Sequence, residues 1–363
     1  MRCRLTVIVT LALAIVMASS GNGRAADANY RSTYTYDTGA TGIDLGGQPL
    51  GYPSGMFSSV MARDKILRRR LAALGMELRP HFYVKGFDMI DLLDGQQLEV
   101  GLLGDMPTIL SAVTNEVAIV ALVKQTFSSV IARDVAQIGE LRGKRIGNAS
   151  GSSAHHALLR GLRSAGLSEK DVTLVPLNVD EMPEALAKGS IDAFAAWEPA
   201  PSIALRSGKA FKTVYRGLST DYFVLSRGFV QRHPDGAREV VAAFVRALNW
   251  MSSSQEALLQ SSSWTLADGA AFSGKAQKTT PDQAAAIVRQ EILDVVSAPV
   301  IPRTGTDGRD LLQSEFEFLQ ELGKIPPGMG WDRVASSFAR DLLREILERQ
   351  GRYQLSEFDY DTP

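Results

Sequence analysis

"KRIGNASGSSAHHALLRGLRSAG", residues 144–166, is the stretch of sequence that says most about the fold. Lys144-Arg145-Ile146 predict a short strand, and Gly147–Gly151 predict a turn. From Ser153 onward apolar residues recur at helical spacing, and Gly166 predicts the end of that helix. A strand, a tight turn and a helix in this order are typical of an α/β protein.

The rest of the chain extends this alternation of strands and helices. Strands are predicted at 77–84, 98–103, 118–123, 128–133, 144–148, 172–177, 191–196 and 222–226. Helices are predicted at 55–74 and, in a mostly helical last third, around 235–251, 281–296, 309–322 and 331–349. The serine clusters at 252–254 and 261–263 predict breaks or exposed turns, and the polar end, 351–363, is expected to be loosely held.

The turn at 147–151 suggests three kinds of chemistry, of which anion binding is the best supported. Ser152 or Ser153 stands where a helix N-cap belongs, and the first turn of a helix leaves N–H groups unsatisfied and partly positive. Glycine lets a ligand approach the backbone, so Gly151 and its neighbours can form a seat for an anion. A capped helix start without any ligand is the commoner fate of Gly-Ser-Ser, and this alternative stays open.

Catalysis and metal binding are less favoured at the same turn. A nucleophilic serine needs an orienting group and an oxyanion hole, and the Gly-x-Ser-x-Gly pattern is absent here. His155 and His156 are adjacent, so on a helix they point about 100° apart rather than toward one metal ion. We expect one histidine to face a cleft as a neutral donor, and we expect no metal, no cofactor and no enzymatic activity.

The N-terminus predicts a secretory signal over residues 1–26. Arg2 and Arg4 precede a short apolar run, and small residues follow, so cleavage is expected near Ala25 or Ala26. The apolar run is too short to span a bilayer as a stable helix. Cys3 is the only cysteine and leaves with the signal, which excludes disulfides and thiol chemistry from the mature chain.

Composition excludes further classes of protein. The chain has 363 residues, of which 45% are hydrophobic and 22% charged, with a formal net charge of −1. These values are typical of a globular protein with one large or two medium domains. No block of basic residues is present, so nucleic acid is not expected as a partner.

Three further loops resemble the first in make-up, and each has a solvated turn as its plainer interpretation. They are "LGGQPLGYPSG" (45–55), "GDMPT" (104–108) and "WEPAP" (197–201), and "STDYF" (219–223) lies at a predicted crossing between lobes. Open α/β sheets bind ligands at the ends of their strands. Helix, glycine, strand and an acid before proline recur at 89–107 and 184–199, as two similar lobes would give.

At the level of motifs the chain resembles the periplasmic substrate-binding proteins of ABC importers for aliphatic sulfonates, taurine and nitrate. The segments that carry the resemblance are "LGDMPTI" (103–109), "GSSAHHALLRGLRSAGL" (151–167), "GSIDAFAAW" (189–197) and "WEP" (197–199). The likeness covers about residues 35–250. It implies a two-lobed fold of type II, with two crossovers and a ligand cleft between the lobes. Lobe 1 is expected to comprise 30–122 and 220–363, and lobe 2 to comprise 123–219.

The resemblance also implies a set of ligand-binding residues and partners. The expected site residues are Tyr52, Ser54, Gly55, Gly104, Asp105, Met106, Gly151, Ser152, Ser153, His155, Trp197, Glu198 and Asp221. Related sulfonate binders often carry Asp after the tryptophan, whereas this chain has Glu198, which leaves the exact ligand open. The expected partners are a small anionic ligand, a membrane permease and its ATPase, and the protein itself is expected to be a periplasmic monomer.

The preferred ligand is an aliphatic sulfonate, because a sulfonate stays ionised and needs several N–H and O–H donors. Nitrate, bicarbonate, taurine or a thiamin pyrimidine precursor stacked on Trp197 and Tyr52 are the alternatives among binding proteins. A periplasmic sensor and an enzyme resembling the fungal pyrimidine synthases are further alternatives. The enzyme is disfavoured because those proteins need a cysteine-rich segment.

Overall fold

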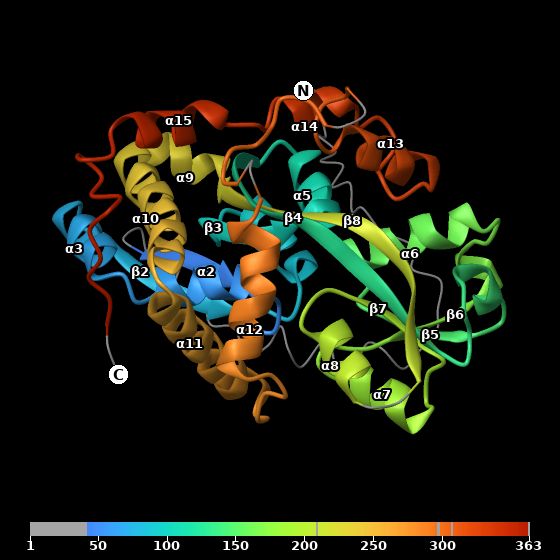
Figure 1. Cartoon of the computed structure of the whole chain (residues 1–363). Coiled ribbons are helices and arrows are strands. Elements are labelled where there is room, and N and C mark those ends of the chain that lie inside the picture. The colour runs from blue at the N-terminus through green and yellow to red at the C-terminus, as the bar shows by residue number, and fades with distance from the viewer. Residues whose placement is uncertain (1–41, 208–209, 296–297, 306–307, 362–363) are drawn as a thin grey trace, which may run out of the picture. The chain divides into compact units, whose positions relative to one another are not determined.

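The computed structural model describes residues 42–361 except 208–209, 296–297 and 306–307 (Figure 1). The predicted signal at 1–26 and the first residues of the predicted lobe 1 lie outside these described residues. The strands are β1 (Gly42–Gly47), β2 (Glu77–Phe82), β3 (Val100–Gly104), β4 (Val117–Arg133), β5 (Arg145–Asn148), β6 (Thr173–Pro176), β7 (Ala193–Ala196) and β8 (Phe211–Ser226).

Helices alternate with these strands and then dominate the last third of the chain. They are α2 (Ser54–Met61), α3 (Lys65–Ala73), α4 (Ile90–Asp94), α5 (Asp105–Ala112), α6 (Ser153–Ser164), α7 (Met182–Lys188), α8 (Ala200–Arg206), α9 (Arg227–Arg232), α10 (Pro234–Ser253), α11 (Gln255–Ser273), α12 (Pro281–Val288), α13 (Gln313–Glu321), α14 (Trp331–Ala335) and α15 (Arg340–Glu348). A π-helical turn, η4 (Arg289–Leu293), follows α12. The α/β class predicted from the sequence is confirmed.

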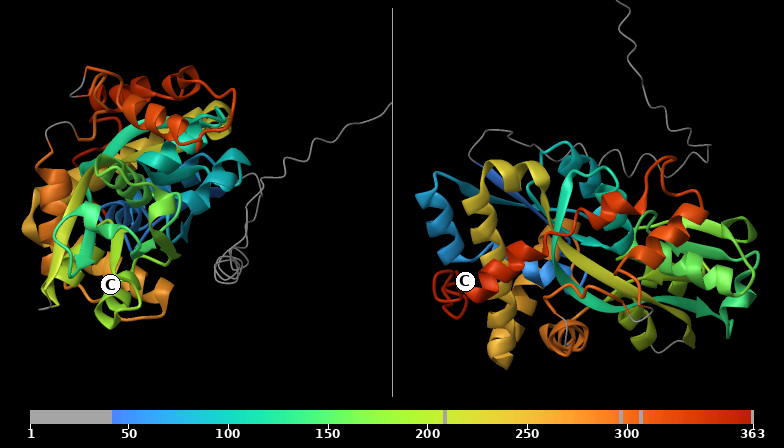
Figure 2. Two further views of the ribbon diagram at one scale, coloured as in Figure 1. Left: turned by 90° about the vertical axis from the view of Figure 1, so that its right-hand side faces the viewer. Right: turned by 90° about the horizontal axis from the view of Figure 1, so that it is seen from above.

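One mixed sheet of eight strands has the order β2-β1-β3-β8-β4-β7-β5-β6. The outer strands pair in parallel, β1 with β2 and β3 on one side and β5 with β6 and β7 on the other. The central strands β4 and β8 pair antiparallel with each other and with their neighbours. They are 17 and 16 residues long, and Figure 2 shows them running through both halves of the structure.

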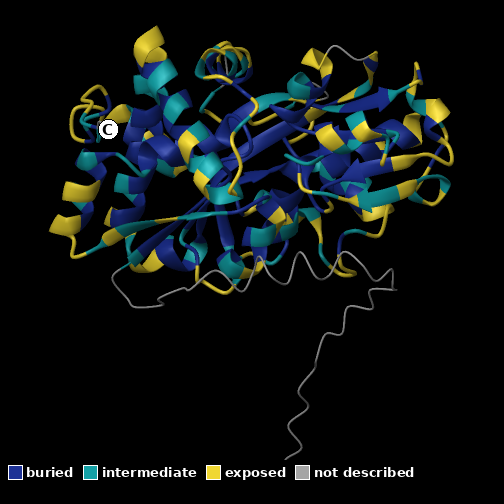
Figure 3. Ribbon diagram, turned by 90° about the horizontal axis from the view of Figure 1, so that it is seen from below, coloured by how far each residue is buried: buried dark blue, intermediate teal, exposed yellow. Residues whose placement is uncertain are grey.

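Two separate hydrophobic cores lie along this sheet. The first core contains buried residues from Ile43 to Val123 and from Phe223 to Tyr360, among them the stacked rings of Phe57, Phe223 and Phe244. Apart from Leu50, the second core is drawn from residues 130–211. Figure 3 shows buried residues along the strands of the sheet and exposed residues mainly on the outer helices and loops. Motion of the two halves as separate lobes, with the predicted bounds, stays a prediction.

Several predicted elements differ from the structure. The strands predicted at 118–123 and 128–133 are one strand, β4, and the strand at 222–226 is the end of the much longer β8. The break predicted at 261–263 is wrong, because these serines lie inside α11. Their hydroxyls donate hydrogen bonds to backbone carbonyls one turn earlier in the helix.

The loosely held end predicted at 351–363 is also wrong for the described part of it. Tyr353 and Leu355 are buried in the first core, and the backbone carbonyl of Tyr353 accepts a hydrogen bond from the fully buried Arg246. Composition alone suggested a loose tail. The apolar residues Tyr353 and Leu355 are buried by contacts with residues that are distant in the sequence.

Candidate functional site

The start of α6 is built as the sequence predicts. Gly151 has φ +79°, which is accessible to glycine at little cost, and Ser152 is the N-cap. The Ser152 hydroxyl accepts from His155 N at 3.2 Å and donates to Ala149 O at 2.6 Å. Ser152 therefore caps the helix with its side chain. Ser153, the first helical residue, has no hydrogen bond to its hydroxyl among the described residues.

Ser153 faces the other half of the molecule. A Cβ built on Gly104 would lie 1.9 Å from Ser153 Oγ, so the serine hydroxyl sits directly against the glycine backbone. Gly104 is the last residue of β3, beside the first core, whereas Ser153 begins a helix of the second core. The start of α6 and the end of β3 are thus in contact across the two halves.

A small cavity lies at this contact. Its volume is about 20 Å³, about enough for one water molecule. Seven of the predicted site residues line it: Tyr52, Ser54, Gly104, Ser152, Ser153, Trp197 and Asp221. They come from the loops after β1, β3, β5 and β7 and from β8, so the structure brings all four predicted loops to one place.

The remaining predicted residues are not among the lining residues of this cavity; they are Gly55, Asp105, Met106, Gly151, His155 and Glu198. Gly55 packs against the backbone of Gln48 and Pro49, where a side chain would collide. Asp105 and Met106 begin α5, and the Asp105 carboxylate accepts from Met106 N at 2.6 Å and from Thr220 N at 3.3 Å. Glu198 accepts from Ser202 N at 3.3 Å, at the start of α8.

The two histidines are engaged with the protein. Gly151 N–H donates to His155 Nδ1 at 3.2 Å, and His155 Nε2 lies 3.0 Å from Glu169 Oε1, so Nε2 is the ring nitrogen that donates to Glu169. His155 therefore takes one N–H of the helix start away from any ligand. The hydrogen bond from His155 lowers the pKa of Glu169 to about 2, although partial burial of this carboxylate acts in the opposite direction. Lys324, whose Nζ lies 2.8 Å from Glu169, lowers the pKa further.

His156 has a different environment. It is fully buried, with Nδ1 3.4 Å from Asp105 Oδ1 and its ring 5.6 Å from that of Phe318. Neither histidine lines the cavity. The role predicted for His155 as a ligand contact stays a prediction, and the structure shows a geometry in which it supports the turn at Gly151.

Sequence analysis did not single out Lys124, which lines the cavity and is 1% exposed. It lies on β4 opposite Asp221 of β8, with Nζ 3.7 Å from Asp221 Oδ2. Ser54 Oγ donates to the same carboxylate oxygen at 2.5 Å. The lone lysine after the apolar run 117–123 was a usable signal. The prediction of two short strands placed it instead in a connection between them.

Several carboxylates surround Lys124. Burial would lower the pKa of Lys124, but Asp221, Glu291, Asp105 and Glu198 outweigh burial and raise it, so the lysine is charged. Burial raises the pKa of Asp221, which Lys124 opposes, and that of Glu198. Burial also raises the pKa of Glu291 to about 7. Its Oε2 has no hydrogen-bond partner among the described residues.

Helix N-termini balance part of this negative charge. Helices α2, α5, α6 and α8 all begin beside the cavity or its lining loops. Asp105 occupies the start of α5 and Glu198 that of α8, so the N-termini of these helices offset part of the charge of these two carboxylates. The positive ends of α2 and α6 and the Lys124–Asp221 pair remain at the cavity, which is an environment suited to an anion.

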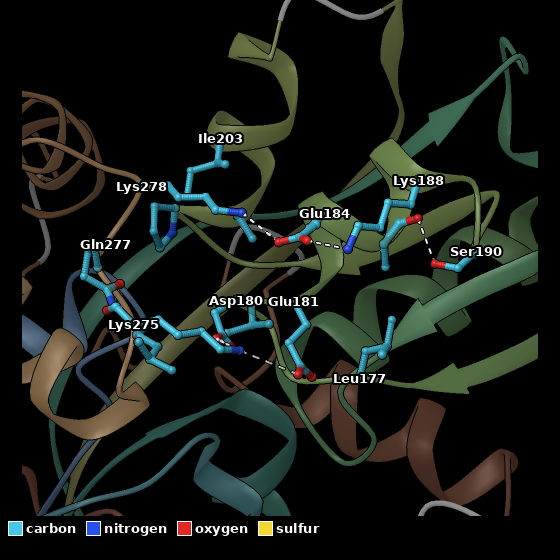
Figure 4. Close-up of a pocket in the computed structure, with 16 residues that line it drawn as sticks. Leu177, Asp180, Glu181, Glu184, Lys188, Ser190, Ile203, Lys275, Gln277 and Lys278 are labelled. Carbon is cyan, nitrogen blue, oxygen red and sulfur yellow. Dashed lines mark hydrogen bonds and ion pairs between the residues drawn. The ribbon is translucent and has the colours of Figure 1, made fainter.

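A larger cavity of about 440 Å³ lies nearby and contains none of the predicted site residues (Figure 4). Its floor is aliphatic, with Leu50, Leu177 and Ile203 among the lining side chains. Its rim is charged, with Lys275 Nζ 3.7 Å from Asp180 and Lys278 Nζ 3.2 Å from Glu184. These pairs join the end of α11 to the region of α7, so they too connect the two halves.

Metal-ligand clusters and membrane-spanning helices can be assessed for the described residues alone. These residues contain no group of three or more His, Cys, Asp or Glu side chains placed to hold a metal ion. None of their helices is both long and apolar enough to cross a membrane.

The predicted resemblance to solute-binding proteins of ABC importers is confirmed by comparison with known proteins. The model of the NMT1-like family matches residues 105–264, which include β4, the start of α6, Trp197 and Asp221. The relatives named below are mostly binding proteins, and they favour binding over catalysis for this fold.

The chain is 24% identical over 209 residues to a putative aliphatic sulfonates-binding protein of Escherichia coli, covering 54% of this chain and 65% of that relative. It is 34% identical over 115 residues to a putative aliphatic sulfonates-binding protein of Bacillus subtilis, covering 30% and 34%. It thus spans less than two thirds of both. It is also 24% identical over 255 residues to a taurine-binding periplasmic protein of Escherichia coli, covering 66% and 76%.

Solved structures show the same fold at low identity. The alkanesulfonate-binding protein SsuA from Xanthomonas axonopodis pv. citri, bound to MOPS, superposes with a TM-score of 0.64 at 19% identity, covering 83% of this chain and 98% of that one. The nitrate-binding protein NrtA from Synechocystis gives 0.60 at 12%, covering 87% and 91%. A desulfurization enzyme, DSZB, gives 0.55 at 18%, covering 85% and 99%, so the fold also occurs in an enzyme.

Proposed function

We propose that the protein is the extracytoplasmic solute-binding component of an ABC importer. It binds a small organic anion, an aliphatic sulfonate in the first place, and delivers it to a membrane permease served by an ATPase. The names of the relatives and the predicted secretory signal support a periplasmic location. The observation that carries the proposal is the start of α6, where Ser152 and Ser153 line the small cavity and the Ser153 hydroxyl has no hydrogen-bond partner among the described residues.

The size of the cavity implies a movement of the protein on binding. A space of about 20 Å³ holds no sulfonate, so the two halves must separate to admit a ligand. The halves meet at several places: Tyr52 N donates to Glu198 O at 3.0 Å, Ser153 abuts Gly104, and the ion pairs Lys275–Asp180 and Lys278–Glu184 join them at the larger cavity. We propose that residues 30–122 with 220–363, and residues 123–219, move as two lobes about β4 and β8. Hinged closure around a ligand is a common device in transport proteins.

Thermal stabilisation by small anions tests the proposed function. The secreted chain should gain several degrees in Tm with methanesulfonate or ethanesulfonate, because only the folded protein binds the ligand. The Ser152→Ala, Ser153→Ala double variant should lose this gain, and Ser153→Ala alone should lose most of it. Ser150→Ala is the matched control, since Ser150 is exposed in the same turn.

The outcomes separate the ligand from the fold. Stabilisation by nitrate or bicarbonate, with none by sulfonates, would reject the sulfonate as the ligand but would still support a protein that binds small anions. Unchanged stabilisation of the double variant by sulfonate would show that the start of α6 is not the seat. Stabilisation by a pyrimidine alone would favour the heterocycle alternative.

Taurine is the second candidate ligand, and Asp221 is the observation that favours it. This carboxylate lines the cavity together with the anion donors. A ligand with both a sulfonate and an ammonium group would satisfy both kinds of side chain. In the same thermal experiment, a larger shift with taurine than with ethanesulfonate would select the zwitterion.

A further inference from the structure

Lys124 is a charged side chain that the fold has buried at the ligand cavity. Its side chain is 2% exposed, and the structure gives its ammonium group one ion-pair partner within 4 Å, Asp221. Burying a charged side chain costs free energy unless the charge is paired or hydrogen-bonded. A lysine has three N–H donors, so the Asp221 contact leaves it with capacity for another acceptor.

A bulge in β4 aims Lys124 at the cavity. Leu122 pairs with Tyr222 and Lys124 pairs with Asp221, so Val123 is an extra residue in β4. Leu122 N donates instead to Pro299 O at 2.8 Å, which satisfies the backbone at the irregularity. Bulges of this kind re-aim side chains next to functional sites. Lys124 and Asp221 consequently share a face of the β4–β8 ladder.

The size of the cavity places Lys124 close to the helix start. Lys124, Ser153 and Asp221 all line the same space of about 20 Å³. A group of atoms that enters this space when the halves separate and close again meets the lysine, the serine hydroxyl and the first turn of α6 together. Lys124 is the one cationic side chain among the lining residues of this cavity.

We propose that Lys124 is the cationic contact of the ligand's anionic head group and that Asp221, its partner in the ligand-free protein, opposes the binding of a simple anion. The inference rests on the proposed function of the site and adds its charge selectivity. An incoming sulfonate shares the Lys124 ammonium with Asp221. The carboxylate penalises an anion without a positive group, and it rewards a ligand that carries an ammonium group beside its sulfonate.

The test measures Kd by calorimetry for four proteins with methanesulfonate, taurine and nitrate as probes. The proteins are the wild type, Asp221→Asn, the double variant Lys124→Met, Asp221→Asn, and the control Lys188→Met. Lys124→Met alone would strand a buried carboxylate and risks unfolding, so it is made only in combination with Asp221→Asn. Lys188 is exposed and pairs with Glu184 on its own helix, outside the small cavity.

The proposal predicts opposite signs for Asp221→Asn. Methanesulfonate should bind about 3- to 10-fold more tightly, because a repulsive charge is gone, and taurine should bind less tightly. The double variant should bind methanesulfonate about 10- to 100-fold more weakly than Asp221→Asn, which is the usual worth of a charge-assisted hydrogen bond. Lys188→Met should match the wild type.

Equal affinity of the double variant and Asp221→Asn for methanesulfonate, both folded by circular dichroism, overturns the role of Lys124. An affinity for methanesulfonate that Asp221→Asn leaves unchanged or weakens overturns the role of Asp221. A wild type that binds none of the three probes is a different result, because it rejects the proposed function and the inference falls with it.

Discussion

Gly104→Ala is a perturbation confined to the contact between the two halves. Gly104 has φ −69° and ψ 174°, a conformation that alanine adopts without strain, so the change adds one methyl group and leaves the local backbone intact. That methyl group would lie 1.9 Å from Ser153 Oγ, 3.2 Å from Ser153 Cβ and 3.4 Å from Asp221 Oδ1. Under the proposed movement of the two lobes, this clash with Ser153 is present only while the halves are closed.

The magnitude follows from packing. A methyl group forced into a filled space costs roughly 1–3 kcal/mol. If the protein relieves the clash by holding its halves apart, this cost falls on the closed, ligand-bound state. With about 1.4 kcal/mol for each factor of ten, the ligand should bind about 5- to 150-fold more weakly. The free energy of unfolding of the ligand-free protein should change much less.

Calorimetry with the preferred sulfonate gives Kd, and urea denaturation without ligand gives the free energy of unfolding. Gly139→Ala is the matched control, because its Cβ would meet only Ala165 Cβ at an ordinary 3.6 Å. The Gly104→Ala, Ser153→Ala double variant removes the closest collision but also a ligand donor, so it should not recover full affinity. Wild-type affinity in Gly104→Ala would refute the idea that closure brings β3 against α6 around the ligand.

Two further predictions concern buried charges. Arg246→Met should lower the free energy of unfolding, measured in urea, by about 3–5 kcal/mol, because it leaves the buried Asp64 carboxylate, 2.7 Å from the arginine, without its partner. A loss below about 1 kcal/mol would contradict this. The Arg246→Met, Asp64→Asn double variant should lose less stability than Arg246→Met alone. Glu291→Gln should flatten the pH dependence of stability. Burial raises the pKa of Glu291 from 4.5 to about 7, so the folded protein binds more protons than the unfolded chain in this range and loses stability as the pH rises through it. Glu291→Gln should therefore have a higher Tm than the wild type at about pH 8 and nearly the same Tm at about pH 4.5. A Tm equal to that of the wild type at both pH values would contradict the raised pKa of Glu291.

The start of α6 was predictable because its signals are local. A turn glycine, a capping serine and a helical repeat of apolar residues all lie within residues 147–166, and each acts on its own neighbours. The other three candidate loops could be proposed for the same reason. Each combines a strand end with glycine or proline, and such loops meet at one edge of an α/β sheet.

Lys124 was missed because its position depends on distant residues. The bulge before it is stabilised by Pro299 O, and its partner Asp221 is far away in the chain. Neither relation leaves a local pattern. The end of the chain failed for a similar reason, since Tyr353 becomes buried only through contacts with residues such as Arg246 on α10.

The different make-up of the two cores has a consequence for the order in which the protein forms. The second core is drawn from residues 130–211, apart from Leu50, so this part of the chain can condense once that stretch has been delivered. The first core joins Ile43 to Tyr353 and Tyr360, so it needs both ends of the described structure. Because a chain emerges from its N-terminus, we expect the half built around the first core to be completed after the other half.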